Sequence, residues 1–220
     1  MATYKRKCMW SSQRGLAVPA MSTRKKDGVQ LIVGVYVDDL VITGANCDGI
    51  REFKMEMPKA FRMSDLSLLH YYLGIEVKQS AEGISLRQGS YALKILDWSS
   101  MADCKLNQAP MEALLKLSKL SDKELVDATE FHSIVGSLRY LVNTHPDLAF
   151  AVGYVSPFVE AVKKILRYVA GTWEWGLWLG RKKQQETCLI GFSDSDYAGD
   201  VDARKSTTGV IFFFGDSPIT

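Results

Sequence analysis

An acidic pair inside an apolar run places the tightest constraint on how this chain can fold. Residues 30–44 read QLIVGVYVDDLVITG, with β-branched and aromatic side chains on both sides of Asp38 and Asp39. Such side chains favour strands, whereas adjacent aspartates favour turns. The run therefore predicts two apolar strands joined at the acidic pair in a β-hairpin. The pair is either a solvated turn or a site where a divalent cation such as Mg²⁺ relieves the repulsion between two carboxylates.

The remaining pattern predicts a mixture of helices and short strands. Residues 1–27 have no period and are expected to form an irregular lead-in. A helix is expected over residues 48–60, and Pro58 should end or kink it. A second hairpin is expected from strands at residues 71–77 and 84–87. Further elements are expected as helices opening at Ser90, Asp127 and Pro146, a helix over residues 159–170, and strands over residues 187–193 and 207–214.

Composition narrows the functional classes. The 220 residues carry 27 Lys and Arg against 25 Asp and Glu, so any nucleic-acid site must come from local clustering of charge. The four cysteines are far apart and form no CxxC pair, which argues against a zinc site and a disulfide framework. No apolar run approaches the roughly 20 residues of a membrane span, and no apolar segment of a signal peptide follows the basic N-terminus. We expect an intracellular protein of the cytoplasm or nucleus that is neither secreted nor membrane-spanning.

Two further clusters are candidates for chemistry. Asp194 opens an acidic loop that is either solvated or a metal site, and alanine at 198 with lysine at 205 excludes an EF-hand. The basic residues Lys163, Lys164 and Arg167 precede a tryptophan-rich stretch, residues 173–178. Basic and aromatic side chains together can bind a phosphate backbone and stack on bases. The alternative is a charged helix face beside core tryptophans.

The run LIVGVYVDDLVITG is similar to the active-site hairpin of reverse transcriptases of Ty1/copia-type retrotransposons. Several later segments resemble that family in the same order, among them FKMEMPKAFRMSDLSLLHYYLGIEV, EGISLRQGSYALKIL, FHSIVGSLRYLVNTHPDLAFAV and AVKKILRYVAGT. The stretch GFSDSDYAGDVDARKSTTGVIFFFG resembles the opening of the RNase H domain of the same polyprotein. The resemblance extends over residues 28–220.

The resemblance implies an α+β fold with a partial reverse-transcriptase palm built from hairpins, a helical thumb and connection, and a truncated RNase H-like start. The implied domains are residues 28–88 for the palm and primer grip, 89–182 for the thumb and connection, and 183–220 for the RNase H-like part. They follow the lead-in of residues 1–27.

The resemblance also implies roles for particular residues. Asp38, Asp39 and Asp194 would be catalytic and would bind the metal, Mg²⁺ or alternatively Mn²⁺. Tyr36 would lie near the primer end, and Leu73, Gly74 and Ile75 would belong to the primer grip. The partners would be an RNA or DNA template–primer and a deoxynucleoside triphosphate, joined by two-metal nucleotidyl transfer. The oligomeric state is not implied.

The chain also departs from the family pattern. The family has another metal-binding palm aspartate well upstream, whereas residues 1–27 hold Asp27 as their one acidic residue. The later carboxylates of RNase H are also missing. We therefore expect a fragment of an RNA-directed DNA polymerase without activity of its own. The alternative is a non-catalytic nucleic-acid-binding remnant or a functionless, degenerate transposon product.

Overall fold

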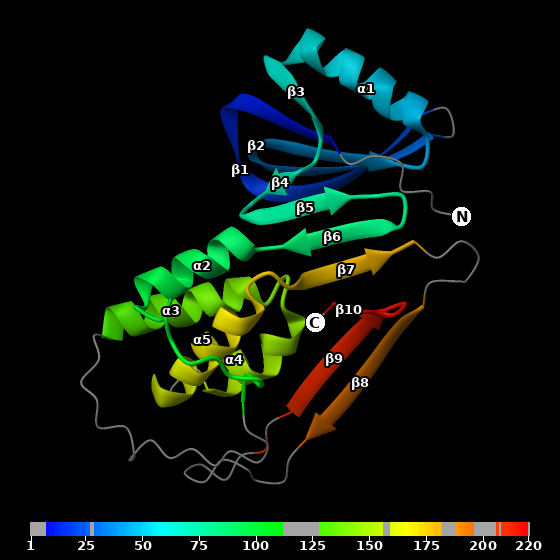
Figure 1. Ribbon diagram of the computed structural model, residues 1–220. Helices are drawn as coiled ribbons and strands as arrows, with labels where there is room; N and C mark the ends of the chain where they lie inside the picture. Colours follow the sequence, from blue (N-terminus) through cyan, green and yellow to red (C-terminus); the bar gives the residue numbers. More distant parts are fainter. Residues whose placement is uncertain are drawn as a thin grey trace. The chain divides into compact units, whose positions relative to one another are not determined.

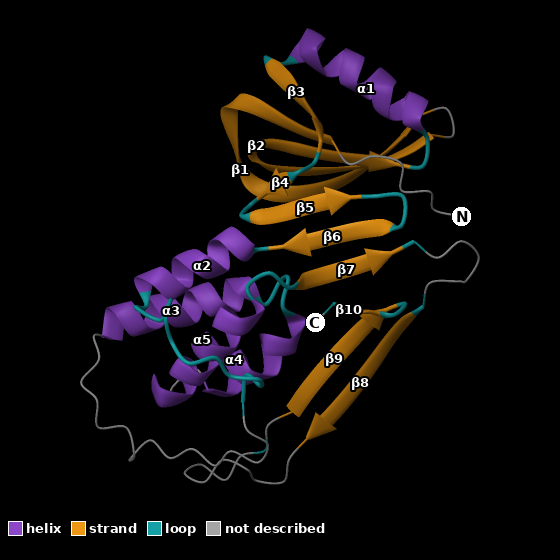
Figure 2. Cartoon of the chain, viewed as in Figure 1, coloured by secondary structure: helices purple, strands orange, loops and turns teal. Residues whose placement is uncertain are grey.

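The chain has a mixed α+β fold that divides into two compact units, Met1–Tyr72 and Leu73–Thr220 (Figure 1). This computed structural model describes residues 8–26, 29–111, 128–155, 159–181, 188–195, 206 and 208–219. Within these ranges, four of the five α-helices lie in the second unit (Figure 2).

The first unit is a twisted antiparallel sheet with one helix. Its elements are β1 (Cys8–Lys26), β2 (Val29–Gly44), α1 (Cys47–Ala60), β3 (Met63–Leu68) and β4 (Tyr71–Tyr72). The three long strands pair in the order β2-β1-β3.

An apolar core holds α1 against this sheet. Ile50 and Phe53 of α1 are buried together with apolar side chains of β2, among which Ile42 is fully buried. These residues follow the helical spacing on α1 and the alternation of a strand on β2, so each element has one apolar side. The buried residues of the cluster are Leu31, Val33, Leu40, Ile42, Ile50 and Phe53.

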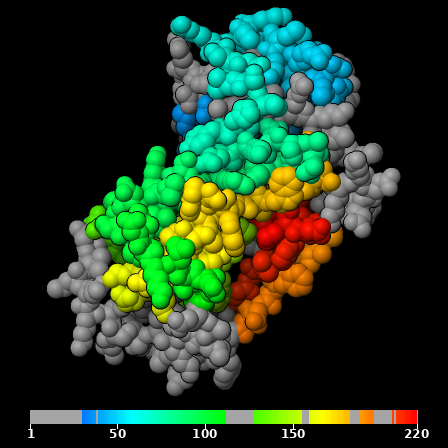
Figure 3. All heavy atoms as spheres, viewed as in Figure 1, coloured from blue at the N-terminus to red at the C-terminus, as the bar shows by residue number. Residues whose placement is uncertain are grey.

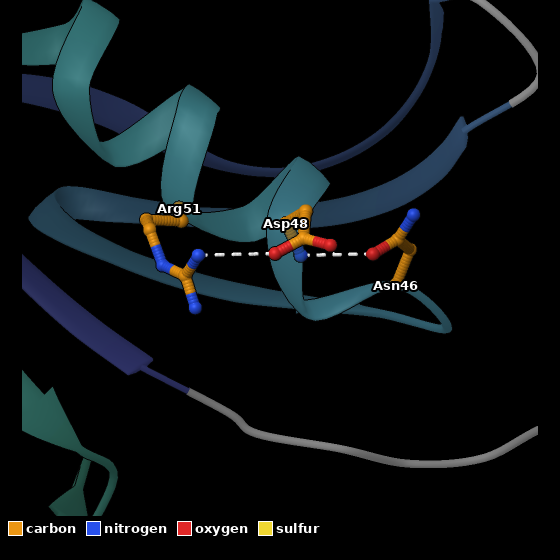
Figure 4. A network of polar contacts seen from close by, with 3 residues as sticks. All are labelled: Asn46, Asp48 and Arg51. Carbon is orange, nitrogen blue, oxygen red and sulfur yellow. Dashed lines mark hydrogen bonds and ion pairs between the residues drawn. The ribbon is translucent and has the colours of Figure 1, made fainter.

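The start of α1 is fixed by the N-cap residue Asn46, and the helix begins at Cys47, one residue before the expected start. The Asn46 Oδ1 atom accepts a hydrogen bond from the Asp48 backbone N–H at 2.8 Å, and Asp48 pairs with Arg51 at 3.0 Å (Figure 4). The helix ends at Ala60, as expected, and it contains Pro58. Of the two effects expected of Pro58, termination of the helix is wrong and a kink stays a prediction.

The expected hairpin at the acidic pair is also wrong. β2 continues through Asp38 and Asp39 as one strand, and β1 occupies residues that were expected to be irregular. β1 pairs with β2 from Lys26↔Val29 to Cys8↔Ile42 and supplies backbone partners on both sides of the acidic pair. Because β1 pairs with β2 along its length, the backbone groups of β2 have partners without a turn at Asp38 and Asp39.

The strand β1 contains bulges where it pairs with the segment around the acidic pair. From Ala20 to Ser11 the strand β1 advances nine positions, while β2 advances four, from Val35 to Asp39. Such bulges bend a strand and increase its twist. They face the segment of β2 that carries Tyr36 and the acidic pair.

The second unit contains an antiparallel sheet in the order β5-β6-β7. These strands are β5 (Ile75–Gln79), β6 (Gly83–Arg87) and β7 (Gly176–Gly180). The β5–β6 pair confirms the second hairpin, although the first expected strand is interrupted by a turn at Leu73 and Gly74.

Four helices and a short 3₁₀ segment form the core of this unit. They are α2 (Gly89–Trp98), α3 (Ala128–Leu141), η1 (Pro146–Leu148), α4 (Ala149–Val155) and α5 (Val159–Thr172). The helix expected to open at Asp127 is found as α3, where Val135, Leu138 and Leu141 are buried in one cluster with side chains of α2, α4 and α5. The predicted cap Asp127 lies outside the described residues.

The remaining strands form a separate small sheet. They are β8 (Leu189–Ser195), β9 (Thr208–Phe214) and β10 (Ser217–Pro218), in the order β10-β9-β8. β8 and β9 confirm the two strands expected at the end of the sequence, with shifts of a residue or two. Every residue of β8 is exposed.

Candidate functional site

The part of β2 just before the acidic pair is exposed and has a strained backbone. Tyr36 and Val37 are 37% and 39% exposed, Asp39 is half-buried, and Leu40 is buried. Val37 has a φ of 52°. A β-branched residue is strongly disfavoured in this left-handed region, and such strain often marks functional sites. The Asp38 side chain lies outside the described part of the structure.

Asp39 has a tyrosine neighbour that the sequence did not indicate. The pKa of Tyr72 is raised above its ordinary value by burial, and further by the charges of Asp39 and Tyr36. Tyr72 comes from β4, and no sequence spacing links it to β2.

The segment predicted as the primer grip is a tight turn in the second unit. Leu73 and Gly74 have φ values of 51° and 78°, so both occupy the left-handed region. The Tyr140 hydroxyl, from α3, donates a hydrogen bond to the Leu73 carbonyl. A Cβ at Gly74 would lie 3.6 Å from the Tyr140 ring. Tyr140 thus holds a turn that lies far from it in the sequence, and the sequence analysis did not single it out.

The predicted basic residues lie on α5 and are only partly accessible. Lys163, Lys164 and Arg167 are all half-buried. Lys163 pairs with Glu160 at 3.0 Å, which neutralises part of the charge of this helix face. The contribution of these three residues to nucleic-acid binding stays a prediction.

Asp194 lies near the end of β8 and is exposed. Its Oδ1 atom accepts a hydrogen bond from the Ser195 backbone N–H at 2.9 Å. Among the described residues, no three His, Cys, Asp or Glu side chains are grouped so that they could hold a metal ion. The binding of Mg²⁺ by Asp38, Asp39 or Asp194 stays a prediction.

The predicted residues are divided between the two units. Tyr36 and the acidic pair belong to the first unit, whereas the turn at Leu73, the α5 cations and Asp194 belong to the second. A pocket of about 310 Å³ in the first unit contains none of them and holds the Lys54–Asp65 ion pair, at 2.6 Å. No helix in the described ranges has both the length and the apolar character needed to cross a membrane.

Comparison with known proteins shows which family the chain resembles. Residues 12–113 match the family described as reverse transcriptase (RNA-dependent DNA polymerase). This stretch includes the strained acidic segment of β2 and the turn held by Tyr140. No solved structure matches the chain.

Curated relatives include transposon Pol polyproteins and a plant mitochondrial protein. The chain is 40% identical to the retrovirus-related Pol polyprotein from transposon RE1 of Arabidopsis thaliana, over 84% of this chain and 13% of the relative. It is 36% identical to the Pol polyprotein from transposon TNT 1-94 of Nicotiana tabacum, over 86% of this chain and 15% of the relative. It is also 36% identical to the uncharacterized mitochondrial protein AtMg00810 of Arabidopsis thaliana, over 82% of this chain and 78% of that protein.

The chain therefore spans about an eighth to a seventh of the length of these Pol polyproteins but most of the mitochondrial relative. Sequence identity, the matched family and the order of the motifs agree with one another. The chain belongs to the reverse transcriptase (RNA-dependent DNA polymerase) family of copia-type transposon Pol polyproteins.

Proposed function

We propose that the chain is the part of an RNA-directed DNA polymerase that binds the template–primer and contributes Asp38 and Asp39 to its Mg²⁺ ions. The observation that carries this proposal is the match of residues 12–113 to the reverse transcriptase family, which includes the run Tyr36-Val37-Asp38-Asp39. The metal ions of this chemistry supply charge stabilisation at the primer oxygen and the triphosphate.

The local geometry of β2 supports this assignment. The strained backbone at Val37 and the exposure of Tyr36 present the segment at the surface, where a nucleic acid can reach it. Burial raises the pKa of Tyr72, and the negative charge of Asp39 raises it further, so the two side chains interact electrostatically. A carboxylate without a cation would repel the phosphates of a primer, and a divalent cation would reverse that repulsion.

A binding experiment tests the metal role separately from catalysis. The affinity of the chain for an RNA template annealed to a DNA primer is measured with and without Mg²⁺, for the native chain and for Asp38→Asn. We expect Mg²⁺ to tighten binding in the native chain and to have little effect in Asp38→Asn. Without Mg²⁺ the variant should bind as well as the native chain or better, because a negative charge is lost. Primer extension, where it is detected, should disappear in the variant.

A matched control comes from another aspartate of the same unit. Asp48 is exposed, pairs with Arg51 and lies at the start of α1 (Figure 4). Asp48→Asn should leave the Mg²⁺ effect unchanged. An equal Mg²⁺ effect in the native chain and in Asp38→Asn contradicts the proposal, as does a chain that binds no template–primer.

A further inference from the structure

A series of buried polar side chains joins three separate parts of the second unit. Gln88, Thr144, His145 and Thr172 are all buried, and His145 is only 1% exposed. They belong to the N-cap of α2, the segment between α3 and η1, and the last position of α5. α2 and α5 pack against each other, and their atoms are adjacent in the space-filling view (Figure 3). This polar series therefore lies where the core helices meet.

Hydrogen-bond distances connect the polar series in one order. The Thr144 Oγ1 atom is 2.9 Å from Gln88 Oε1 and 3.2 Å from His145 Nδ1. On the other side of the ring, His145 Nε2 is 3.2 Å from the Thr172 carbonyl oxygen. Because an unpaired polar group is costly when it is buried, each of these contacts needs one donor and one acceptor. The protons of the series can therefore be assigned from the contacts.

The Thr172 carbonyl fixes the first proton. A carbonyl oxygen can only accept, so His145 Nε2 carries a proton and donates it to Thr172. The ring is then either the neutral tautomer, which has a lone pair on Nδ1, or the cation, which has a proton on both nitrogens. The Thr144 hydroxyl has a single proton to donate, so the state of the ring decides where that proton points.

The two states of the ring require opposite orientations of the Gln88 amide. Beside the neutral ring, the Thr144 hydroxyl donates to Nδ1, and only an amide N–H of Gln88 can complete the contact with the Thr144 oxygen. Beside the charged ring, Nδ1–H donates to Thr144, whose hydroxyl donates to Gln88 Oε1. In this second arrangement Gln88 Nε2 is buried with no hydrogen-bond partner in the part of the chain that the structure describes. Turning the amide over gives that nitrogen a partner beside the neutral ring.

We propose that the polar series is a proton-sensitive junction, in which protonation of His145 reverses the hydrogen bonds through Thr144 and turns the Gln88 amide over. Histidine is the side chain whose charge ordinarily changes between about pH 5 and pH 8. The junction involves neither the acidic pair nor a nucleic acid, so it stands apart from the polymerase role proposed above.

The charged groups of the neighbouring segments are oriented away from the buried series. Arg87 before α2, Arg139 on α3, Asp147 on η1 and Glu174 after α5 are all exposed. Asp147 accepts a hydrogen bond from the Tyr168 hydroxyl at 2.7 Å. Burial raises the pKa of Tyr168, as does its bond to Asp147, so this phenol stays uncharged in the pH range of the switch. The two hydrogen-bond partners of the imidazole are themselves uncharged, which leaves the ring as the group that titrates within the series.

The test is nuclear magnetic resonance of the full chain with ¹⁵N in its histidine and glutamine side chains, between about pH 8 and pH 5. At the upper pH, His145 should be the tautomer with its proton on Nε2. On acidification, Nδ1 should gain a proton, and the Gln88 side-chain amide signals should shift with the same midpoint. Gln88→Glu supplies a carboxylate that can only accept, so it should raise the His145 midpoint by about 1–3 pH units, the effect of a nearby opposite charge.

His132 provides the matched control, because it is an exposed histidine on α3. His132→Gln should leave the Gln88 response unchanged, whereas Thr144→Val should uncouple Gln88 from His145, with far-ultraviolet circular dichroism to verify folding. The native chain alone overturns the proposal if His145 carries its proton on Nδ1 at the upper pH, if it stays neutral down to pH 5, or if it titrates without a shift at Gln88. A Gln88 response that survives in folded Thr144→Val also overturns it.

Discussion

At the scale of single residues, the hydroxyl of Tyr140 is the most informative group to remove. Tyr140→Phe keeps the ring against Gly74 but deletes the donor to the Leu73 carbonyl. We expect a loss of about 1 kcal/mol in the free energy of urea unfolding, the usual net value of such a bond. Amide exchange at residues 73–75 should become faster, because the left-handed turn at Leu73 loses its support.

The control for this prediction is the tyrosine that packs against Tyr140. Tyr91 and Tyr140 meet edge to face with ring centroids 5.4 Å apart. Tyr91→Phe preserves that ring contact and should change stability by less than about 0.5 kcal/mol, as substitutions away from key contacts do. Equal losses in the two variants would show that Tyr140 does not act through its hydroxyl.

The sequence could locate a site residue only where the signal came from its immediate neighbours in the chain. The acidic pair could be located from the apolar residues around it, whereas the turn at Leu73 and Gly74 was not predicted, because residues 71–77 were expected to form one strand. Tyr72 and Tyr140 could not be located, because their proximity to Asp39 and Leu73 arises when distant segments fold together. The strain at Val37 also has no sequence signal, because valine is an ordinary strand residue.

At the scale of elements, α2 depends on a carboxylate from β5. Its N-cap residue Gln88 makes no side-chain capping bond, and Glu76 instead accepts from the backbone N–H of Ser90 in the first turn. This bond, then the bond from the Ser90 hydroxyl, lowers the pKa of Glu76 below its ordinary value of 4.5. An anion at a helix N-terminus is stabilising.

The lowered pKa of Glu76 predicts how the stability of the chain depends on pH. Because the folded-state pKa of Glu76 is lowered, its contribution is complete above the unfolded value near 4.5 and is lost as the pH falls through the lower folded value. Glu76→Gln should therefore be less stable than the native chain at pH 7, and the difference should shrink as the solution is acidified below the unfolded pKa. Urea unfolding at several pH values measures this, with Ser90→Ala expected to show a smaller loss. A difference that does not change with pH would contradict the assigned cause.

The elements themselves were predictable where the pattern is strongly periodic. The apolar residues Phe131, Ile134, Val135, Leu138, Leu141 and Val142 have helical spacing, and α3 covers all of them except Val142. β1 was missed because Pro19 and the scattered polar residues hide any alternation, and a strand can be defined by its partner rather than by its own sequence. The same partner explains why β2 runs through the acidic pair instead of turning at it.

At the scale of the whole molecule, the family could be predicted from the order of the motifs, but the division of the core could not. The buried apolar residues form two clusters, one with α1 and β2 and the other among α2 to α5. Helical and strand periodicity identify which residues are buried but do not say which distant elements share a core. Two clusters within separate units imply that each unit is stabilised largely by its own contacts.

Two large-to-small substitutions test this independence. Ile42 is fully buried in the first cluster and Leu138 is 1% exposed in the second, so Ile42→Ala and Leu138→Ala should each cost about 2–5 kcal/mol in their own unit. Hydrogen exchange followed by mass spectrometry, read on peptides from each unit, distinguishes the effects. Ile42→Ala should speed exchange in β2 and α1 and leave α3 and α5 protected, while Leu138→Ala should do the reverse. The double variant should show the sum of the two patterns, because sites without shared contacts are additive. If either substitution instead speeds exchange equally in both units, the two cores unfold as one cooperative structure and the division into separately stabilised units is wrong.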